Sequence, residues 1–139
     1  MSLYVLDTDI LTLYQSGQEA VVQNVQSRPA TELAVSVISV EERLSGWYTK
    51  LRQAKKRSLL AHAYQRFASA VSFLSHVQIL PFPESAIVRY EVLRAAHRHI
   101  GKNDLRIAAI VLEHGGVLVT RNIKDYKAVQ GLRLENWTD

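Results

Sequence analysis

The sequence predicts an α/β fold of three layers, in which helices cover both faces of a central, mainly parallel sheet of four to five strands. Short apolar segments rich in strand-forming residues alternate along the chain with longer segments of helical periodicity. This alternation is typical of parallel sheets because successive parallel strands need crossover connections, which are usually helices. The chain has 139 residues, of which 47% are hydrophobic and 22% are charged. We therefore expect residues 1–139 to form a single globular domain.

Five short segments are predicted to form the strands. Most are apolar runs rich in β-branched or aromatic residues, and the last is a short Leu-Arg-Leu segment that could form an edge strand. The predicted strands are residues 3–6, 33–37, 77–81, 117–120 and 132–134.

Helices are predicted in the intervening segments, where apolar residues recur every three to four positions. Ser39 and Glu42 have the spacing of a capping box, which predicts that a helix begins at Ser39. Gly101 is expected to end a helix as a C-cap. The predicted helical segments are residues 10–14, 19–26, a helical pair from 39 to 74 joined near the basic stretch 50–57, 85–99, 103–112 and a short helix after 125.

The composition excludes several classes of protein. The chain has no cysteine, which excludes disulfides and thiolate-bound zinc. It has no apolar run of about 20 residues and no signal-peptide pattern, so we expect a cytoplasmic protein without a membrane segment. The net charge of +4 is a mild indication of a polyanionic partner.

Acidic residues follow the predicted strands at the carboxyl edge of the sheet. Asp7 comes directly after the first strand, and Glu42 lies on the first turn of the helix after the second. Asp104 opens a helix, and Asp125 follows the fourth strand together with Asn122. Ligands of open parallel sheets bind beyond the carboxyl ends of the strands. The sequence therefore predicts that these scattered side chains meet in one site.

Such a cluster of acids predicts a cation. Like charges at close range raise one another's pKa unless a cation lies between them. Carboxylate oxygens suit hard divalent ions, here Mg²⁺ or Mn²⁺. Such an ion activates water and stabilises the leaving oxygen of a phosphodiester, which would make the site hydrolytic.

Each acid also has a purely structural explanation. Asp7 and Asp9 could cap the turn after the strand, and for Asp9 capping is the favoured role. The capping box fully explains Glu42. The helix dipole explains an acid at position 104, with Asn103 as the cap. The five histidines lack the spacing of metal ligands and are interpreted as surface or helix-end residues.

Four segments and the C-terminal end resemble, in order, the motifs of PIN-domain ribonucleases, in particular the toxins of VapBC toxin–antitoxin pairs. Many PIN domains carry Asp where this chain has Asn122, and Asn is common where it has Asp9. The segments are Leu6–Leu11, Ile38–Gly46, Ile100–Ala109, Leu118–Tyr126 and Gly131–Trp137.

The resemblance implies a PIN-like fold and a Mg²⁺- or Mn²⁺-dependent endoribonuclease that a cognate VapB-type antitoxin inhibits and that forms a homodimer. It implies two sets of site residues. The catalytic, metal-binding acids would be Asp7, Glu42, Asp104 and Asp125, and the supporting or water-binding residues Thr8, Asp9, Thr120 and Asn122. A third set follows from position: Arg43 and Arg106 lie one or two residues from a proposed metal ligand, where they could contact phosphate or equally well pair with the acids.

Two other functions compete with this interpretation. A strand followed by Asp7-Thr8-Asp9 superficially fits the nucleophile motif of haloacid-dehalogenase-type phosphatases, but Leu11 departs from that motif and no paired-Asp motif follows. A PIN module that binds RNA or an antitoxin without efficient cleavage is the other alternative, because Asn122 replaces an acid.

Overall fold

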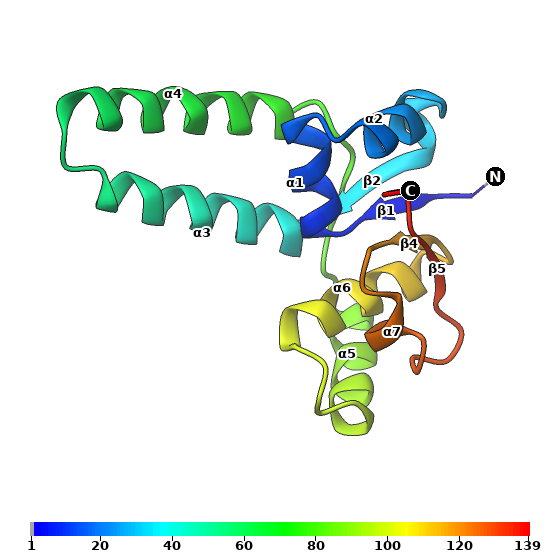
Figure 1. Cartoon of the computed structure of the whole chain (residues 1–139). Helices are drawn as coiled ribbons and strands as arrows, with labels where there is room; N and C mark the ends of the chain where they lie inside the picture. Colours follow the sequence, from blue (N-terminus) through cyan, green and yellow to red (C-terminus); the bar gives the residue numbers. More distant parts are fainter. Residues whose placement is uncertain (1) are drawn as a thin grey trace.

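The computed structural model describes residues 2–139, and its centre is one all-parallel sheet in the order β3-β2-β1-β4-β5. Figure 1 labels β1, β2, β4 and β5 of this sheet. This agrees with the predicted α/β class, and the sheet is parallel throughout. The strands are β1 (Tyr4–Leu6), β2 (Leu33–Ser36), β3 (Ile79–Leu80), β4 (Val117–Val119) and β5 (Arg133–Glu135).

The helices lie on both sides of this sheet. Figure 1 shows α3 and α4 as a long hairpin that extends away from the sheet, with α1 at its base, while α5, α6 and α7 gather on the other side. No helix among residues 2–139 is both long and apolar enough to cross a membrane. The helices are α1 (Thr8–Ser16), α2 (Glu19–Gln26), the 3₁₀ turn η1 (Ala30–Glu32), α3 (Val37–Gln53), α4 (Arg57–Leu74), α5 (Glu84–Ala96), α6 (Lys102–Glu113) and α7 (Ile123–Tyr126).

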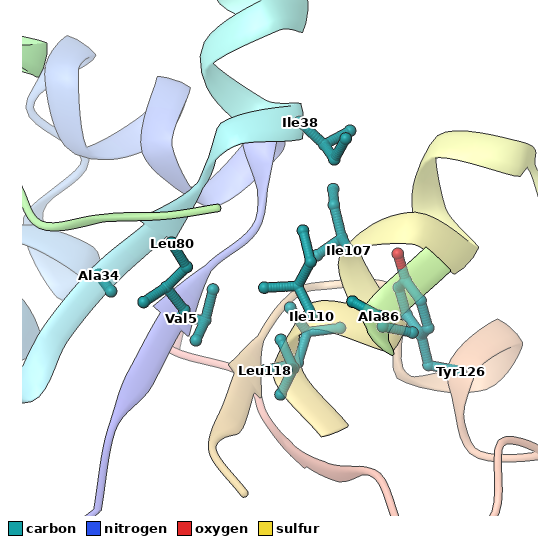
Figure 2. Close-up of a cluster of buried hydrophobic side chains, with 11 residues drawn as sticks. Val5, Ala34, Ile38, Leu80, Ala86, Ile107, Ile110, Leu118 and Tyr126 are labelled. Atoms are coloured by element: carbon teal, nitrogen blue, oxygen red, sulfur yellow. The ribbon is translucent and has the colours of Figure 1, made fainter. Parts of the chain in front are cut away.

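Two hydrophobic cores cover the two faces of the sheet, because successive strand residues point to opposite faces. Val5 and Leu118 face α5, α6 and α7, where they meet Ile107 and Tyr126 (Figure 2). Their neighbours Leu6 and Val119 lie in the second core, with apolar residues of α1, α2 and α4. The predicted three layers are thus present.

The strand order creates a switch point between β1 and β4. From β1 the chain moves outward to β2 and β3, and it then returns to place β4 and β5 on the other side of β1. Crossovers on either side of such a point diverge and leave a crevice at the carboxyl ends of the strands. This topology positions the site described below.

Two predicted helix ends are wrong. Helix α3 is capped by Ser36, whose hydroxyl accepts from the Ser39 backbone N–H, so Ser39 is not the cap and the capping box with Glu42 is absent. Gly101 is the N-cap of α6 rather than a C-cap, and its φ of −58° is ordinary for any residue. Helix α3 begins directly after Ser36, the last residue of β2, and helix α6 begins directly after Gly101.

Candidate functional site

A cavity of about 550 Å³ lies beyond the carboxyl ends of β1 and β4, at the switch point. Its lining is dominated by carboxylates and their hydrogen-bond donors, and it brings together acids from three segments distant in sequence. The lining residues are Asp7, Thr8, Asp9, Thr12, Glu42, Asp104, Thr120, Arg121, Asn122 and Tyr126. We call it the acidic cavity.

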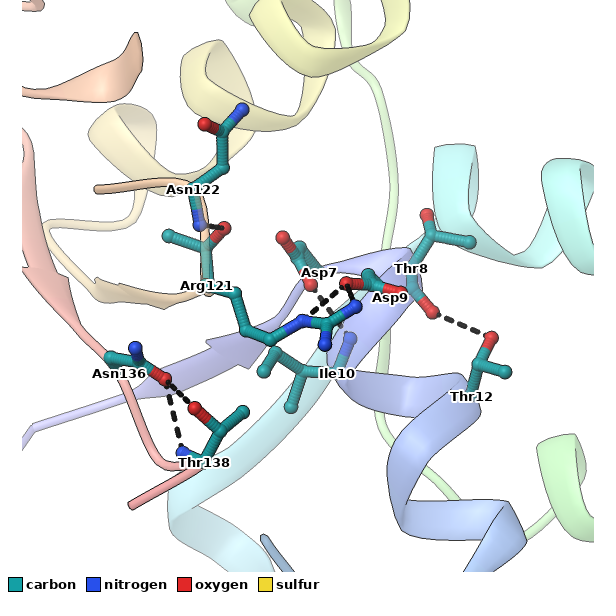
Figure 3. Close-up of polar contacts among 10 residues, drawn as sticks. Asp7, Thr8, Asp9, Ile10, Thr12, Arg121, Asn122, Asn136 and Thr138 are labelled. Carbon is teal, nitrogen blue, oxygen red and sulfur yellow. Dashed lines mark hydrogen bonds and ion pairs between the residues drawn. The ribbon is translucent and has the colours of Figure 1, made fainter. Parts of the chain in front are cut away.

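Asp7 is the most buried acid of the acidic cavity, with 8% of its surface exposed. It is the N-cap of α1, and its Oδ1 accepts from the Ile10 backbone N–H at 2.8 Å (Figure 3). Burial raises the pKa of Asp7 to about 6, although hydrogen bonds from Thr120 and Ile10 favour the charged form. The expected capping role of Asp7 is thus present, and the same carboxylate also lines the acidic cavity.

Glu42 is fixed by residues of two other helices. The Thr8 hydroxyl donates to its Oε1 at 2.5 Å and also lies 2.9 Å from the Ser39 hydroxyl. The Asn103 amide donates to the other carboxylate oxygen, Oε2, at 3.2 Å. Because Ser36 and not Ser39 caps α3, a capping box with Ser39 does not explain the presence of Glu42. Its carboxylate instead joins α3 to α1 and α6 at the cavity.

Asp104 lies in the first turn of α6 and lines the acidic cavity from that helix. Burial raises its pKa, and hydrogen bonding from Tyr126 opposes the rise while the charge of Glu42 adds to it. The Tyr126 hydroxyl also donates to the Asp104 backbone carbonyl at 3.3 Å. The pKa of Tyr126 itself is raised by burial and by Asp104 and Asp7, so this phenol remains a proton donor.

The rim of the acidic cavity carries an exposed ion pair. Arg121 donates to Asp9 Oδ2 from Nη2 at 2.5 Å and from Nε at 2.8 Å (Figure 3). Asp9 thus balances an arginine rather than capping the helix. Behind it, the buried Thr120 hydroxyl accepts from the Asn122 backbone N–H at 2.9 Å, which fixes the start of the loop.

Three predicted site residues lie outside the acidic cavity. Asp125 is exposed on α7, where its Oδ2 accepts from the Asn122 amide at 3.0 Å. Arg106 borders a neighbouring shallow depression and donates to Asn103. Arg43, which follows Glu42 on α3, lines a separate cavity.

The donors of the acidic cavity fit a hard divalent cation in type and charge. Four carboxylates line it, and the only arginine in its lining is paired with Asp9 at the rim. Burial, and to a lesser extent the neighbouring carboxylates, raise the pKa values of Asp7 and Asp104, and a cation between them would favour their charged forms. Among residues 2–139, no three acids or histidines stand close enough together to form a finished set of metal ligands.

Sequence reasoning missed three residues of the site. Asn103 was interpreted as a cap, but it joins Glu42 to Arg106. Tyr126 and Arg121 were not assigned a role. No local signal identifies them, because each acts on a partner at least 22 positions away in the sequence.

Thr8→Val is expected to lower the rate of the reaction at this site by about 10- to 100-fold, because Glu42 loses the donor that orients it. Thr12→Val is the matched control, since Thr12 lines the same cavity but donates only to the Thr8 backbone carbonyl. Turnover of the two variants under identical conditions checks this. Equal losses in both would contradict an orienting role for Thr8.

The fold and the site define a class of protein: α/β proteins with an all-parallel sheet and a carboxylate-lined cleft at the switch point. The chain belongs to the PIN domain family, which its residues 4–132 match. The resemblance found in the motifs is thereby confirmed, and the phosphatase alternative is wrong.

Individual relatives are of the VapC type and match almost the full length. Ribonuclease VapC2 of Rickettsia felis is 29% identical, covering 97% of this chain and 98% of the relative. The tRNA(fMet)-specific endonuclease VapC of Shigella flexneri is 25% identical, covering 99% and 100%. A toxin–antitoxin complex from Klebsiella pneumoniae contains a chain 25% identical, with a TM-score of 0.71 and coverage of 93% and 94%.

Proposed function

We propose that this chain is a metal-dependent endoribonuclease, the toxin of a type II (VapBC) toxin–antitoxin pair, and that residues 1–139 act as a single domain. The observation that carries the proposal is the acidic cavity at the switch point, which Asp7 at the end of β1, Glu42 on α3 and Asp104 on α6 all line. Family membership and the VapC ribonucleases among its relatives support RNA as the substrate.

Asp7, Asp104 and Glu42 would hold the metal, Mg²⁺ or Mn²⁺, because oxygen-only donors suit these ions. When bound, such an ion activates water for attack on a phosphodiester and neutralises the charge of the leaving oxygen. Asp125 remains a fourth candidate, although its carboxylate accepts from Asn122 at the edge of the site.

The surrounding residues orient the acids. Thr8 and Asn103 hold the two oxygens of Glu42, and Thr120 hydrogen-bonds to Asp7. Tyr126 keeps its proton and donates toward Asp104. Arg121 would contact an approaching phosphate, because it is the arginine in the lining of the acidic cavity and its guanidinium is exposed at the rim.

A protein partner is also proposed: a VapB-type antitoxin, together with a second copy of the chain. Support comes from the toxin–antitoxin complex of the Klebsiella relative. Exposed apolar side chains on two helices give further support, because grouped apolar surface usually marks an interface. They include Leu59 and Tyr64 on α4 and Val88 and Val92 on α5.

The proposal is tested with the purified chain, structured RNA and Mg²⁺ or Mn²⁺, with and without EDTA. Cleavage is expected only with the metal. Binding without cleavage in every metal would favour the alternative of a non-catalytic PIN module. Cleavage that persists in EDTA would contradict a metal-dependent site.

A further inference from the structure

A second cavity, of about 780 Å³, lies between α1, α2, α3 and α4. It contains two guanidinium groups, those of Arg43 and Arg66, and none of its lining residues is acidic. Within residues 2–139 neither arginine has a carboxylate within 4 Å. We call it the arginine cavity.

Two buried donors of this cavity lack partners. Arg43 donates from Nη2 to Gln15 at 2.9 Å, but its buried Nε has no acceptor. The Nε1 of Trp47 also has none, although only 6% of this side chain is exposed. Buried polar groups are normally satisfied, so each such orphan requires an explanation. An anionic ligand with several acceptor oxygens would satisfy both.

The electrostatics point the same way. Burial and the positive charge of Arg66 lower the pKa of Arg43. Arg66 and Lys50 lie 5.6 and 4.6 Å from the centre of the Trp47 ring. Two cationic side chains thus lie against one indole, and Arg43 lines the same cavity as Arg66. An anion bound there would relieve the repulsion between these positive charges.

The walls of the arginine cavity add aromatic surface to this charge. Tyr14, Trp47 and Phe73 all line it, and the Tyr14 and Phe73 rings pack with centroids 5.7 Å apart. A cavity of this volume accepts a small organic molecule. Guanidinium groups for a phosphate beside aromatic faces for a base suit a nucleotide unit of single-stranded RNA.

The arginine cavity adjoins the acidic cavity. On α3, Glu42 lines the acidic cavity and the next residue, Arg43, lines the arginine cavity. On α1, Thr12 lines the acidic cavity, and Gln15, one turn further along, lines the arginine cavity. Beyond it, the basic stretch 50–57 joins α3 to α4. A polyanion that extends from the acidic cavity therefore meets positive charge here, which favours RNA over an acidic side chain of a partner protein.

We infer that the arginine cavity is a subsite for a nucleotide flanking the one that is cleaved, with its phosphate on Arg43 and Arg66, near the Trp47 N–H, and its base against the half-buried rings of Tyr14 and Phe73. This inference rests on the proposed function. It assigns to Arg43 a phosphate outside the acidic cavity, and it adds Arg66 and Trp47 to the RNA-binding residues.

The test uses the two indole N–H resonances of the full chain, in EDTA so that no RNA is cut. Trp137 is the internal reference, since its Nε1 already donates to Glu135 at 2.9 Å. Addition of a short single-stranded RNA is expected to shift the Trp47 resonance and leave that of Trp137 in place. Trp47→Phe assigns the resonance by removing it.

Arg66→Ala is expected to weaken RNA binding about tenfold and to reduce the slope of log affinity against log salt by about 1. In the cleavage assay it should raise KM about tenfold with kcat unchanged, and Arg66→Lys should recover part of the loss. Arg98→Ala, an equal charge change at an exposed position beyond the end of α5, is the control and should leave both unchanged.

The subsite and the proposed function fail separately. A chain that does not cut RNA but shows the Trp47 shift retains the subsite. A chain that cuts RNA without the shift, or in which Arg66→Ala equals Arg98→Ala, overturns it. A shift produced by a polyglutamate peptide but not by RNA would also overturn it, in favour of an acidic protein partner.

Discussion

Asp7→Asn is expected to abolish metal-dependent RNA cleavage and, at the same time, to raise the melting temperature of the metal-free protein at neutral pH. Cleavage should fall by at least about 10³-fold because a principal metal ligand is lost. Stability should rise because the buried carboxylate, 8% exposed, is replaced by a neutral amide of the same shape. Asn also serves well as an N-cap, so α1 keeps its start.

The sign of the stability effect follows from the pKa of Asp7, which is raised from 3.8 to about 6 in the folded protein. The folded state therefore holds the proton more tightly, and stability is lost as the pH rises from about 4 to 6. The full cost, at most roughly 3 kcal/mol, applies above about pH 6. The advantage of Asp7→Asn should accordingly disappear near pH 4.

Thermal melts of both proteins in EDTA, from about pH 4 to pH 8, check this. A gain of several degrees is expected at the upper end. Asp9→Asn is the control, because Asp9 is exposed and paired with Arg121, and no gain is expected from it. A variant less stable than the parent at neutral pH, or one that still cuts RNA, would contradict the role given to Asp7.

Asp104→Asn is expected to lower kcat/KM by at least about 10²-fold, whereas Asp125→Asn should change it less than about threefold. Both acids stand in the first turn of a helix, α6 of 12 residues for Asp104 and α7 of 4 residues for Asp125. They differ in position: Asp104 lines the acidic cavity, and Asp125 is exposed.

Parallel steady-state kinetics of these two variants, with melting curves to correct for stability, decide which acid acts with Asp7. Equal losses would mean that Asp125 turns into the cavity when RNA or metal binds. A larger loss for Asp125→Asn would contradict the arrangement described above.

The sheet was predictable because its signals are local. Tyr4–Leu6 and Val117–Val119 are short apolar runs that end at polar residues, and α2 has the predicted bounds of residues 19–26. Once the strands are parallel, their carboxyl ends must share one edge. The placement of Asp7 and Asp104 near that edge follows from the same reasoning.

The details of the acidic cavity were not predictable, because they depend on contacts between distant residues. Ser36 and Ser39 are equally good caps in sequence, and only the end of β2 decides between them. Asn103 meets Glu42 across 61 positions, and Arg121 meets Asp9 across 112. Arg43 is adjacent to Glu42, yet the helical turn directs it into the other cavity.

A crystal structure of the full chain grown with Mn²⁺ measures directly whether the acids share an ion. We expect an anomalous-scattering peak bound by carboxylate oxygens of Asp7 and Asp104, at about 2.0–2.4 Å, with Glu42 bound directly or through water. Carboxylates that remain apart at saturating Mn²⁺, with no common peak between them, would contradict a metal-dependent hydrolytic site.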